Sequence, residues 1–112
     1  MLIPKDKYEP FVSICRTVIE KRYKDAQQSE CYGRLINTRR FDSLKEYLDK
    51  LHPSQILVGG DTDRQDLYIS PTIVGPISPN QSGIMQDEIF GPILPIVPIQ
   101  DIDEAIQIVN SK

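Results

Sequence analysis

The 112-residue sequence has no tryptophan, one histidine and two cysteines. Two cysteines are too few for a disulfide framework, so the reducing cytoplasm is the expected location. The N-terminal residues lack the apolar segment of a secretion signal, and no apolar run approaches the roughly 20 residues of a membrane span. Membrane attachment of a longer parent protein stays open. The net charge of −3 lacks the basic excess of a nucleic-acid-binding surface, so no nucleic-acid partner is expected.

Patterns for several common sites are also missing. His52 is the only histidine, and no serine lies in a nucleophile-like sequence, so no catalytic triad is predicted. Its place before Pro53 predicts that His52 lies at the C-terminal end of the preceding helix and interacts there with the helix dipole. Asp61 and Asp63 begin like a calcium loop, but Asp66 stands where that loop needs glycine. No cluster has zinc-ligand spacing, and neither a metal nor a catalytic residue is predicted.

The pattern of apolar residues predicts one α/β domain over residues 1–112. Leu2-Ile3-Pro4 is typical of the end of a strand, and the sequence stops directly after its last helix. We therefore expect a partial domain that is truncated at both ends. The expected order is helix, helix, strand, strand, strand, helix, over residues 7–23, 38–51, 55–58, 67–74 with a break at Pro71, 93–99, and from Asp101 onward.

Each predicted helix has an apolar stripe at helical spacing, which we expect to be buried. Pro10 places the start of the first helix near residues 7–9. Asn37 or Thr38 is expected to cap the second helix, and Asp101 with Glu104 to form a capping box for the third. The uniformly apolar residues 93–99 predict a single strand covered on both faces. The stripes are Phe11, Ile14, Cys15, Val18, Ile19 and Arg22; Phe41, Leu44, Leu48 and Leu51; and Ile102, Ala105, Ile106 and Val109.

The two cysteines are not expected to act as nucleophiles. Cys15 lies on the apolar stripe of the first helix, which predicts packing in the core. Cys31 follows Glu30, and a neighbouring carboxylate disfavours the thiolate.

Glu88 and Phe90 are the candidate binding residues. They lie two residues apart, so on an extended segment their side chains would point the same way. A carboxylate can accept two hydrogen bonds from a ribose diol, and an aromatic face can support a flat heterocycle. The alternative is an exposed glutamate beside a core phenylalanine, and spacing alone favours that alternative.

The sequence Glu88-Ile89-Phe90-Gly91-Pro92 resembles the E-x-F-G-P signature of the aldehyde dehydrogenases. Further segments follow in the family's order, with spacing that resembles the class-3, fatty-aldehyde-oxidising branch over nearly the whole chain. Several ordered motifs favour the cofactor interpretation of Glu88 and Phe90. The further segments are Tyr32-Gly33-Arg34-Leu35-Ile36-Asn37, Arg40-Phe41, Gly59-Gly60, Tyr68-Ile69-Ser70-Pro71-Thr72-Ile73, Leu94-Pro95-Ile96 and Asp103-Glu104-Ala105-Ile106.

The resemblance implies a partial α/β catalytic domain of an enzyme that oxidises aldehydes to carboxylic acids with NAD or NADP. It further implies that Glu88 hydrogen-bonds the nicotinamide ribose and that Phe90 lies beside the nicotinamide ring. These two residues would orient the cofactor, and the cofactor would carry the redox chemistry. An aldehyde, as a small-molecule substrate, and the nicotinamide cofactor are the implied partners.

The sequence also departs from the family. Neither cysteine lies in the G-Q-x-C-like context of the family's nucleophile, and the E-L-G-G-K general base and the F-T-G-S turn do not occur. We therefore expect the isolated chain to be inactive. An alternative is a non-catalytic interaction module that pairs with a full-length dehydrogenase through exposed strand edges. A small nucleotide-binding domain is a third expectation.

Overall fold

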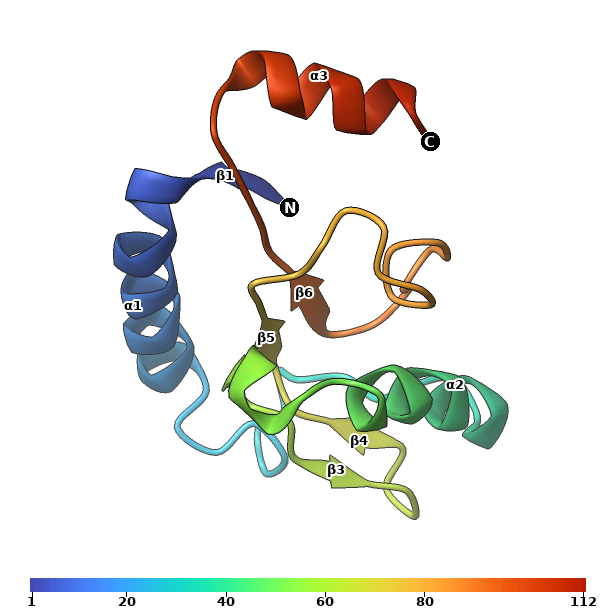
Figure 1. The fold of residues 1–112 in the computed structure, drawn as a ribbon. Coiled ribbons are helices and arrows are strands. Elements are labelled where there is room, and N and C mark those ends of the chain that lie inside the picture. Colours follow the sequence, from blue (N-terminus) through green and yellow to red (C-terminus); the bar gives the residue numbers. More distant parts are fainter.

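The computed structural model describes all 112 residues and confirms an α/β arrangement. In Figure 1, α1 and α2 lie on opposite sides of the strands β5 and β6, and α3 lies at the end that holds β1. None of the helices has the length and apolar character needed to cross a membrane. The helices are α1 (Lys5–Arg22), α2 (Thr38–Asp49), α3 (Ile102–Asn110) and a 3-10 turn (Pro53–Gln55). The strands are β1 (Leu2–Pro4), β2 (Ile56–Val58), β3 (Thr62–Asp63), β4 (Tyr68–Ile69), β5 (Thr72–Val74), β6 (Ile93–Pro95) and β7 (Val97–Ile99).

The strands form three small sheets. The largest has the order β2-β5-β6, with β5 antiparallel to β2 and parallel to β6. Strands β1 and β7 pair in parallel, and β3 and β4 form an antiparallel hairpin. The predicted break at Pro71 is confirmed, because Pro71 separates β4 from β5.

The prediction of one strand over residues 93–99 is wrong. The chain turns at Ile96, whose N–H donates to the Val74 carbonyl at 2.9 Å and whose carbonyl accepts from Ile77 N at 2.9 Å. Beyond Ile96 the chain leaves β5 and pairs with β1 instead. A uniformly apolar run showed that both parts are covered, but it could not show that they belong to different sheets.

Helix α2 forms as the sequence predicts. The Asn37 side chain accepts a hydrogen bond from Arg40 N at 2.8 Å and so caps the first turn. The predicted stripe of α2 is buried, together with Leu51 just beyond its end, and Leu44 is fully buried. These residues join Ile69, Val74 and side chains from β6 and β7 in the larger core cluster.

The predictions for α1 are partly wrong. The helix begins at Lys5, so Pro10 lies in its second turn and leaves the Asp6 carbonyl without its helical partner. Tyr8 and Val12 are the buried residues of α1, whereas Ile14 and Val18 of the predicted stripe are exposed. Phe11, Cys15 and Ile19 are half-buried against a second cluster that contains Ile3, Ile73 and Ile96. Helix α1 therefore packs through an adjacent face and leaves part of its apolar stripe uncovered.

Helix α3 also leaves most of its predicted apolar stripe exposed. Its predicted cap is confirmed, since Asp101 Oδ1 accepts from Glu104 N at 2.9 Å. Glu104 completes the cap one residue earlier than expected, because its carboxylate accepts from Gln100 N. Only Ala105 of the predicted stripe is buried, so the burial predicted for the other three residues is wrong. The exposed residues are Ile102, Ile106 and Val109.

His52 begins a new turn rather than closing the preceding helix. Its Nδ1 accepts from Ser54 N at 3.2 Å, and the Gln55 side chain accepts from His52 N at 3.1 Å. The predicted dipole role at the end of α2 is therefore wrong. Instead, the imidazole caps the 3-10 turn that leads into β2.

We expect Leu44→Ala to destabilise the chain by about 2 to 5 kcal/mol, because it leaves a cavity in the larger core cluster. Urea denaturation followed by circular dichroism measures this change. Ile102→Ala is the matched control, since Ile102 is exposed on α3 and should change the free energy of unfolding by less than about 0.5 kcal/mol. Equal effects of the two substitutions would contradict this description of the core.

Candidate functional site

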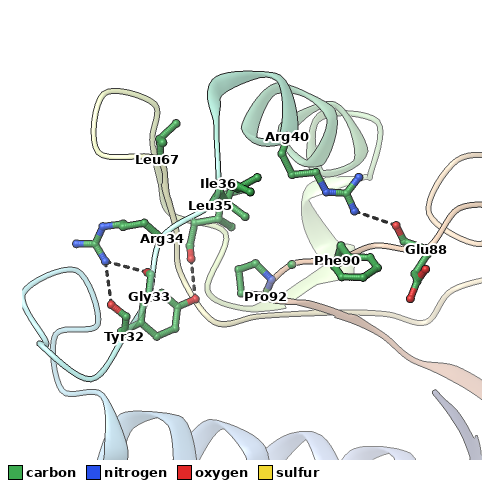
Figure 2. A pocket seen from close by; sticks show the side chains of 12 residues that line it. Tyr32, Gly33, Arg34, Leu35, Ile36, Arg40, Leu67, Glu88, Phe90 and Pro92 are labelled. Atoms are coloured by element: carbon green, nitrogen blue, oxygen red, sulfur yellow. Dashed lines mark hydrogen bonds between the residues drawn. The ribbon is translucent and has the colours of Figure 1, made fainter.

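A hollow lies between the segment of residues 32–36, the start of α2 and the loop that precedes β6 (Figure 2). Its volume is about 720 Å³. Glu88 and Phe90 both line it, so the structure brings the two predicted residues to one pocket. The lining residues are Tyr32, Gly33, Arg34, Leu35, Ile36, Arg40, Leu67, Ile69, Glu88, Phe90, Gly91 and Pro92.

Phe90 is not a core residue. The residue is 75% exposed, so the alternative of a core phenylalanine is wrong. The assumption of an extended segment is also wrong, because the chain from Gly83 to Asp87 folds into turns and Phe90 has a φ of 45°. Gln86 N and Asp87 N both donate to the Gly83 carbonyl, at 2.9 and 3.3 Å. An irregular loop that follows this turn, rather than strand alternation, therefore places Phe90 and Glu88 on the same pocket.

One face of α2 holds this loop. Arg40, Leu44 and Tyr47 follow the i, i+4, i+7 spacing of a single helix face. Nη2 of Arg40 donates to the Glu88 carbonyl at 2.9 Å and also to the Ile89 carbonyl, and Figure 2 shows the guanidinium beside the Phe90 ring. The Tyr47 hydroxyl donates to Asp87 Oδ2 at 2.6 Å.

Gly91 and Pro92 close the loop against the core and the sheet. A Cβ on Gly91 would lie 2.3 Å from Leu44 Cδ1, so only glycine lets the backbone approach α2 this closely. The Pro92 carbonyl accepts from Thr72 N at 2.8 Å, which aligns the chain with β5 just before β6 begins. The Gly-Pro pair thus fixes where the loop ends.

The opposite wall is held by hydrogen bonds to β4 and the residue before it. The Tyr32 hydroxyl donates to the Ile69 carbonyl at 2.7 Å, and Leu35 N donates to the Leu67 carbonyl at 2.9 Å. The Tyr32 ring packs edge-on against those of Tyr23 and Tyr68, with centroids 5.3 and 5.8 Å apart. Burial raises the pKa of Tyr32, so its hydroxyl stays a neutral donor.

Arg34 completes this wall. Its guanidinium lies 2.9 Å from Asp66 Oδ2 and 5.0 Å from the centroid of the Tyr68 ring. The Gln27 side chain donates to the same aspartate at 3.2 Å. The sequence prediction missed Arg34 and Arg40 as site residues. For Arg40 a signal existed, because it shares its helix face with Leu44.

Neither cysteine lines the pocket. Cys15 is half-buried on α1, where burial raises the pKa of its thiol, and Cys31 is exposed in a loop. Cys15 lies instead in a second groove of about 480 Å³, whose other lining residues include Ile14, Val18 and Leu94. No group of three or more potential metal ligands gathers anywhere in the structure.

The pocket offers groups that can contact a ligand, but no cysteine lines it that could act as a nucleophile. The Glu88 side chain is exposed and forms no ion pair, so its carboxylate is free to accept hydrogen bonds from a ligand. The Phe90 ring presents an open aromatic surface. Together the two side chains suit a ligand that combines a diol with a flat ring.

A model of the Aldehyde dehydrogenase family matches residues 1–112. The rat protein named "Aldehyde dehydrogenase, dimeric NADP-preferring" is 41% identical over 108 residues, which is 89% of this chain and 23% of the relative. "Aldehyde dehydrogenase family 3 member A2" from Pongo abelii is 42% identical over 99 residues, which is 88% of this chain and 20% of the relative. The chain therefore spans between a fifth and a quarter of these relatives.

Solved structures agree with this match. The "Substrate bound state of Staphylococcus Aureus AldH" superimposes with a TM-score of 0.91 at 32% identity, over 98% of this chain and 24% of that one. An indole-3-acetaldehyde dehydrogenase in complex with NAD⁺ has a TM-score of 0.76 at 23% identity, over 97% of this chain and 23% of that one, and so shows the shared fold alone.

Acid is expected to loosen the pocket wall that Arg34 holds. The hydrogen bond from Arg34, and then that from Gln27, lowers the pKa of Asp66 below its ordinary value of 3.8. A lowered pKa in the folded state stabilises the fold above the ordinary value, and this contribution is lost as the pH falls through the lowered pKa. Because Arg34 lies over Tyr68, the near-ultraviolet circular dichroism of the tyrosines should weaken below about pH 3.8.

Two variants separate this contact from general acid unfolding. Asp66→Asn should show the weakened tyrosine signal already at neutral pH, with little further change between pH 6 and 3. Asp42→Asn is the matched control, since it removes an equivalent pair with Arg64 outside the pocket and should keep the pH response. A pH response in Asp66→Asn that equals that of the unmodified chain would contradict the assignment.

Proposed function

Because the chain belongs to the aldehyde dehydrogenase family, we propose that its pocket holds the nicotinamide end of the cofactor in an NAD(P)-dependent aldehyde dehydrogenase. One observation carries the proposal. The exposed Phe90 ring and the free Glu88 carboxylate line the same pocket, and Arg40 of α2 binds the loop that presents them. The E-x-F-G-P resemblance gives the same two residues the same task.

Each residue has a distinct role in this proposal. The Glu88 carboxylate accepts hydrogen bonds from the nicotinamide ribose, and the Phe90 ring packs beside the nicotinamide. When bound, the cofactor would supply a hydride acceptor for the oxidation of the aldehyde, and water would supply the second oxygen of the carboxylic acid. Holding the ring in one orientation keeps the carbon that accepts the hydride within reach of the substrate. This chain's residues therefore contribute orientation rather than bond chemistry.

We further propose that the 112 residues alone do not oxidise aldehydes. The pocket contains no thiol, and neither Cys15 nor Cys31 resembles the family's nucleophile in sequence context. The family's mechanism needs a thiolate that attacks the aldehyde carbon. For the substrate we propose medium- and long-chain aliphatic aldehydes, on the resemblance to the class-3 branch. The relatives' names motivate testing NADP⁺ beside NAD⁺.

Transplanting residues 1–112 into the Staphylococcus aureus AldH, in place of the matching quarter, tests the proposal directly. The chimera should oxidise aliphatic aldehydes with NAD⁺ or NADP⁺, whereas the isolated chain should show no turnover. Glu88→Gln in the chimera should raise the KM for the cofactor by about 10- to 100-fold, because it removes hydrogen bonds to a charged group worth about 1.5 to 3 kcal/mol.

The matched control is Glu20→Gln, which changes an exposed glutamate on α1 that does not line the pocket. It should leave both kcat and the cofactor KM unchanged. The proposal fails if Glu88→Gln behaves like Glu20→Gln in an active chimera, or if a folded chimera has no activity. Turnover by the isolated chain would overturn the proposed inactivity.

The exposed apolar side chains favour a second candidate function, association with a full-length dehydrogenase. Ile14 and Val18 on α1 line the second groove together with the exposed Leu94 of β6. Ile102, Ile106 and Val109 form another uncovered stripe on α3. Apolar patches of this kind often mark protein interfaces.

If the chain acts through association, it should co-purify with a co-expressed full-length dehydrogenase. Replacing Ile14 and Val18 by serine should then weaken the complex, and light scattering after size-exclusion chromatography measures its mass. Lys21→Ser is a matched control on the same helix but outside the groove. A chain that stays monomeric in the presence of the dehydrogenase would exclude this second function.

A further inference from the structure

The loop that presents Glu88 and Phe90 adopts a conformation that needs support. The φ of Phe90, 45°, lies in the left-handed region, which is unfavourable for a residue with a bulky side chain. The ring itself is exposed, so burial of the phenyl group does not compensate for this backbone geometry. Contacts from the rest of the chain must therefore hold the backbone in place.

Arg40 supplies contacts at this point of the loop. Its Nη2 donates to two consecutive carbonyls, those of Glu88 and Ile89, directly before the strained residue. The centre of its guanidinium lies 6.0 Å from the centroid of the Phe90 ring, within the range of a cation–π contact. One side chain thus binds the backbone of the loop and lies against the Phe90 ring.

The chemistry of arginine suits this task better than that of lysine. A guanidinium is planar, carries five N–H donors and can lie against an aromatic ring while it donates hydrogen bonds. A lysine ammonium is a compact charge that cannot present the same planar contact. The backbone of Arg40 is fixed in the first turn of α2, where its N–H donates to the Asn37 side chain.

We propose that Arg40 is a positioning residue of the cofactor pocket: it holds the loop at Glu88 and Ile89, so that the Glu88 carboxylate and the Phe90 ring face one ligand. The inference rests on the proposed cofactor role of Glu88 and Phe90, and Arg40 acts through those two residues. Loss of the guanidinium frees this part of the loop, and the pocket then binds the cofactor less tightly.

Backbone ¹⁵N relaxation of the full 112-residue chain measures the first part of this effect. The order parameters of residues 88–90 should fall from about 0.85, typical of rigid backbone, to below about 0.6 in Arg40→Gln. Arg40→Lys should give intermediate values. Arg16→Gln is the matched control, since Arg16 makes the same kind of bond, from its guanidinium to the Leu57 carbonyl at 2.9 Å, outside the pocket. It should leave residues 88–90 rigid.

Steady-state kinetics of the chimera with Staphylococcus aureus AldH measure the second effect, the weaker binding of the cofactor. Arg40→Gln should raise the cofactor KM about tenfold, as expected for losing hydrogen bonds from a charged donor, with the thermal midpoint nearly unchanged. Arg40→Lys should recover part of this loss. A purely structural role would instead lower the thermal midpoint and the yield of folded enzyme at constant KM.

The outcomes separate this inference from the proposed function. If Glu88→Gln raises the cofactor KM and Arg40→Gln does not, or if residues 88–90 stay rigid without Arg40, the role of Arg40 is refuted and the pocket assignment survives. If Glu88→Gln has no effect on the cofactor KM, the proposed function itself fails, and the positioning role fails with it.

Discussion

The contact between one face of α2 and the loop before β6 is the constraint on which the site depends. Arg40 binds the loop's carbonyls, Leu44 lies under Gly91, and Tyr47 binds Asp87. Because these residues are spaced by helical turns, a stable α2 presents all three at once. The same helix fills the larger core through Leu44, so the stability of the fold and the shape of the pocket rest on one element.

Elements with strong local signals could be predicted from the sequence, whereas features that depend on contacts between distant segments could not. Helix α2 was predicted correctly because its cap and its buried stripe agree, and a helix with both signals needs little tertiary information. The stripes of α1 and α3 were recognised as apolar, yet Ile14 and Ile106 are exposed. Periodicity shows which face of a helix is apolar, but the neighbouring elements decide what covers it. The same limit explains why residues 93–99 were predicted as one strand.

The site was predicted in part. Spacing drew attention to Glu88 and Phe90 but favoured an ordinary structural role, and the resemblance favoured a binding role; the structure places both at one pocket. The assumed extended geometry was wrong, since a left-handed Phe90 cannot be inferred from residue types that usually avoid this conformation. Arg40 was missed because a basic residue at the start of a helix usually faces solvent. The helix face that it shares with Leu44 was the one signal in the sequence, and its contact with the loop almost 50 residues later is visible only in the structure.

The most direct measurement uses the chain's three phenylalanines, which are Phe11, Phe41 and Phe90. Phe41 is buried, Phe11 is half-buried and Phe90 lines the pocket, so 4-fluorophenylalanine labelling gives each environment its own ¹⁹F signal. On titration with nicotinamide mononucleotide, the Phe90 signal should shift while the other two stay in place. If the Phe90 signal stays fixed at saturating ligand, or if only the Phe11 or Phe41 signal moves, Phe90 is not part of a nicotinamide site.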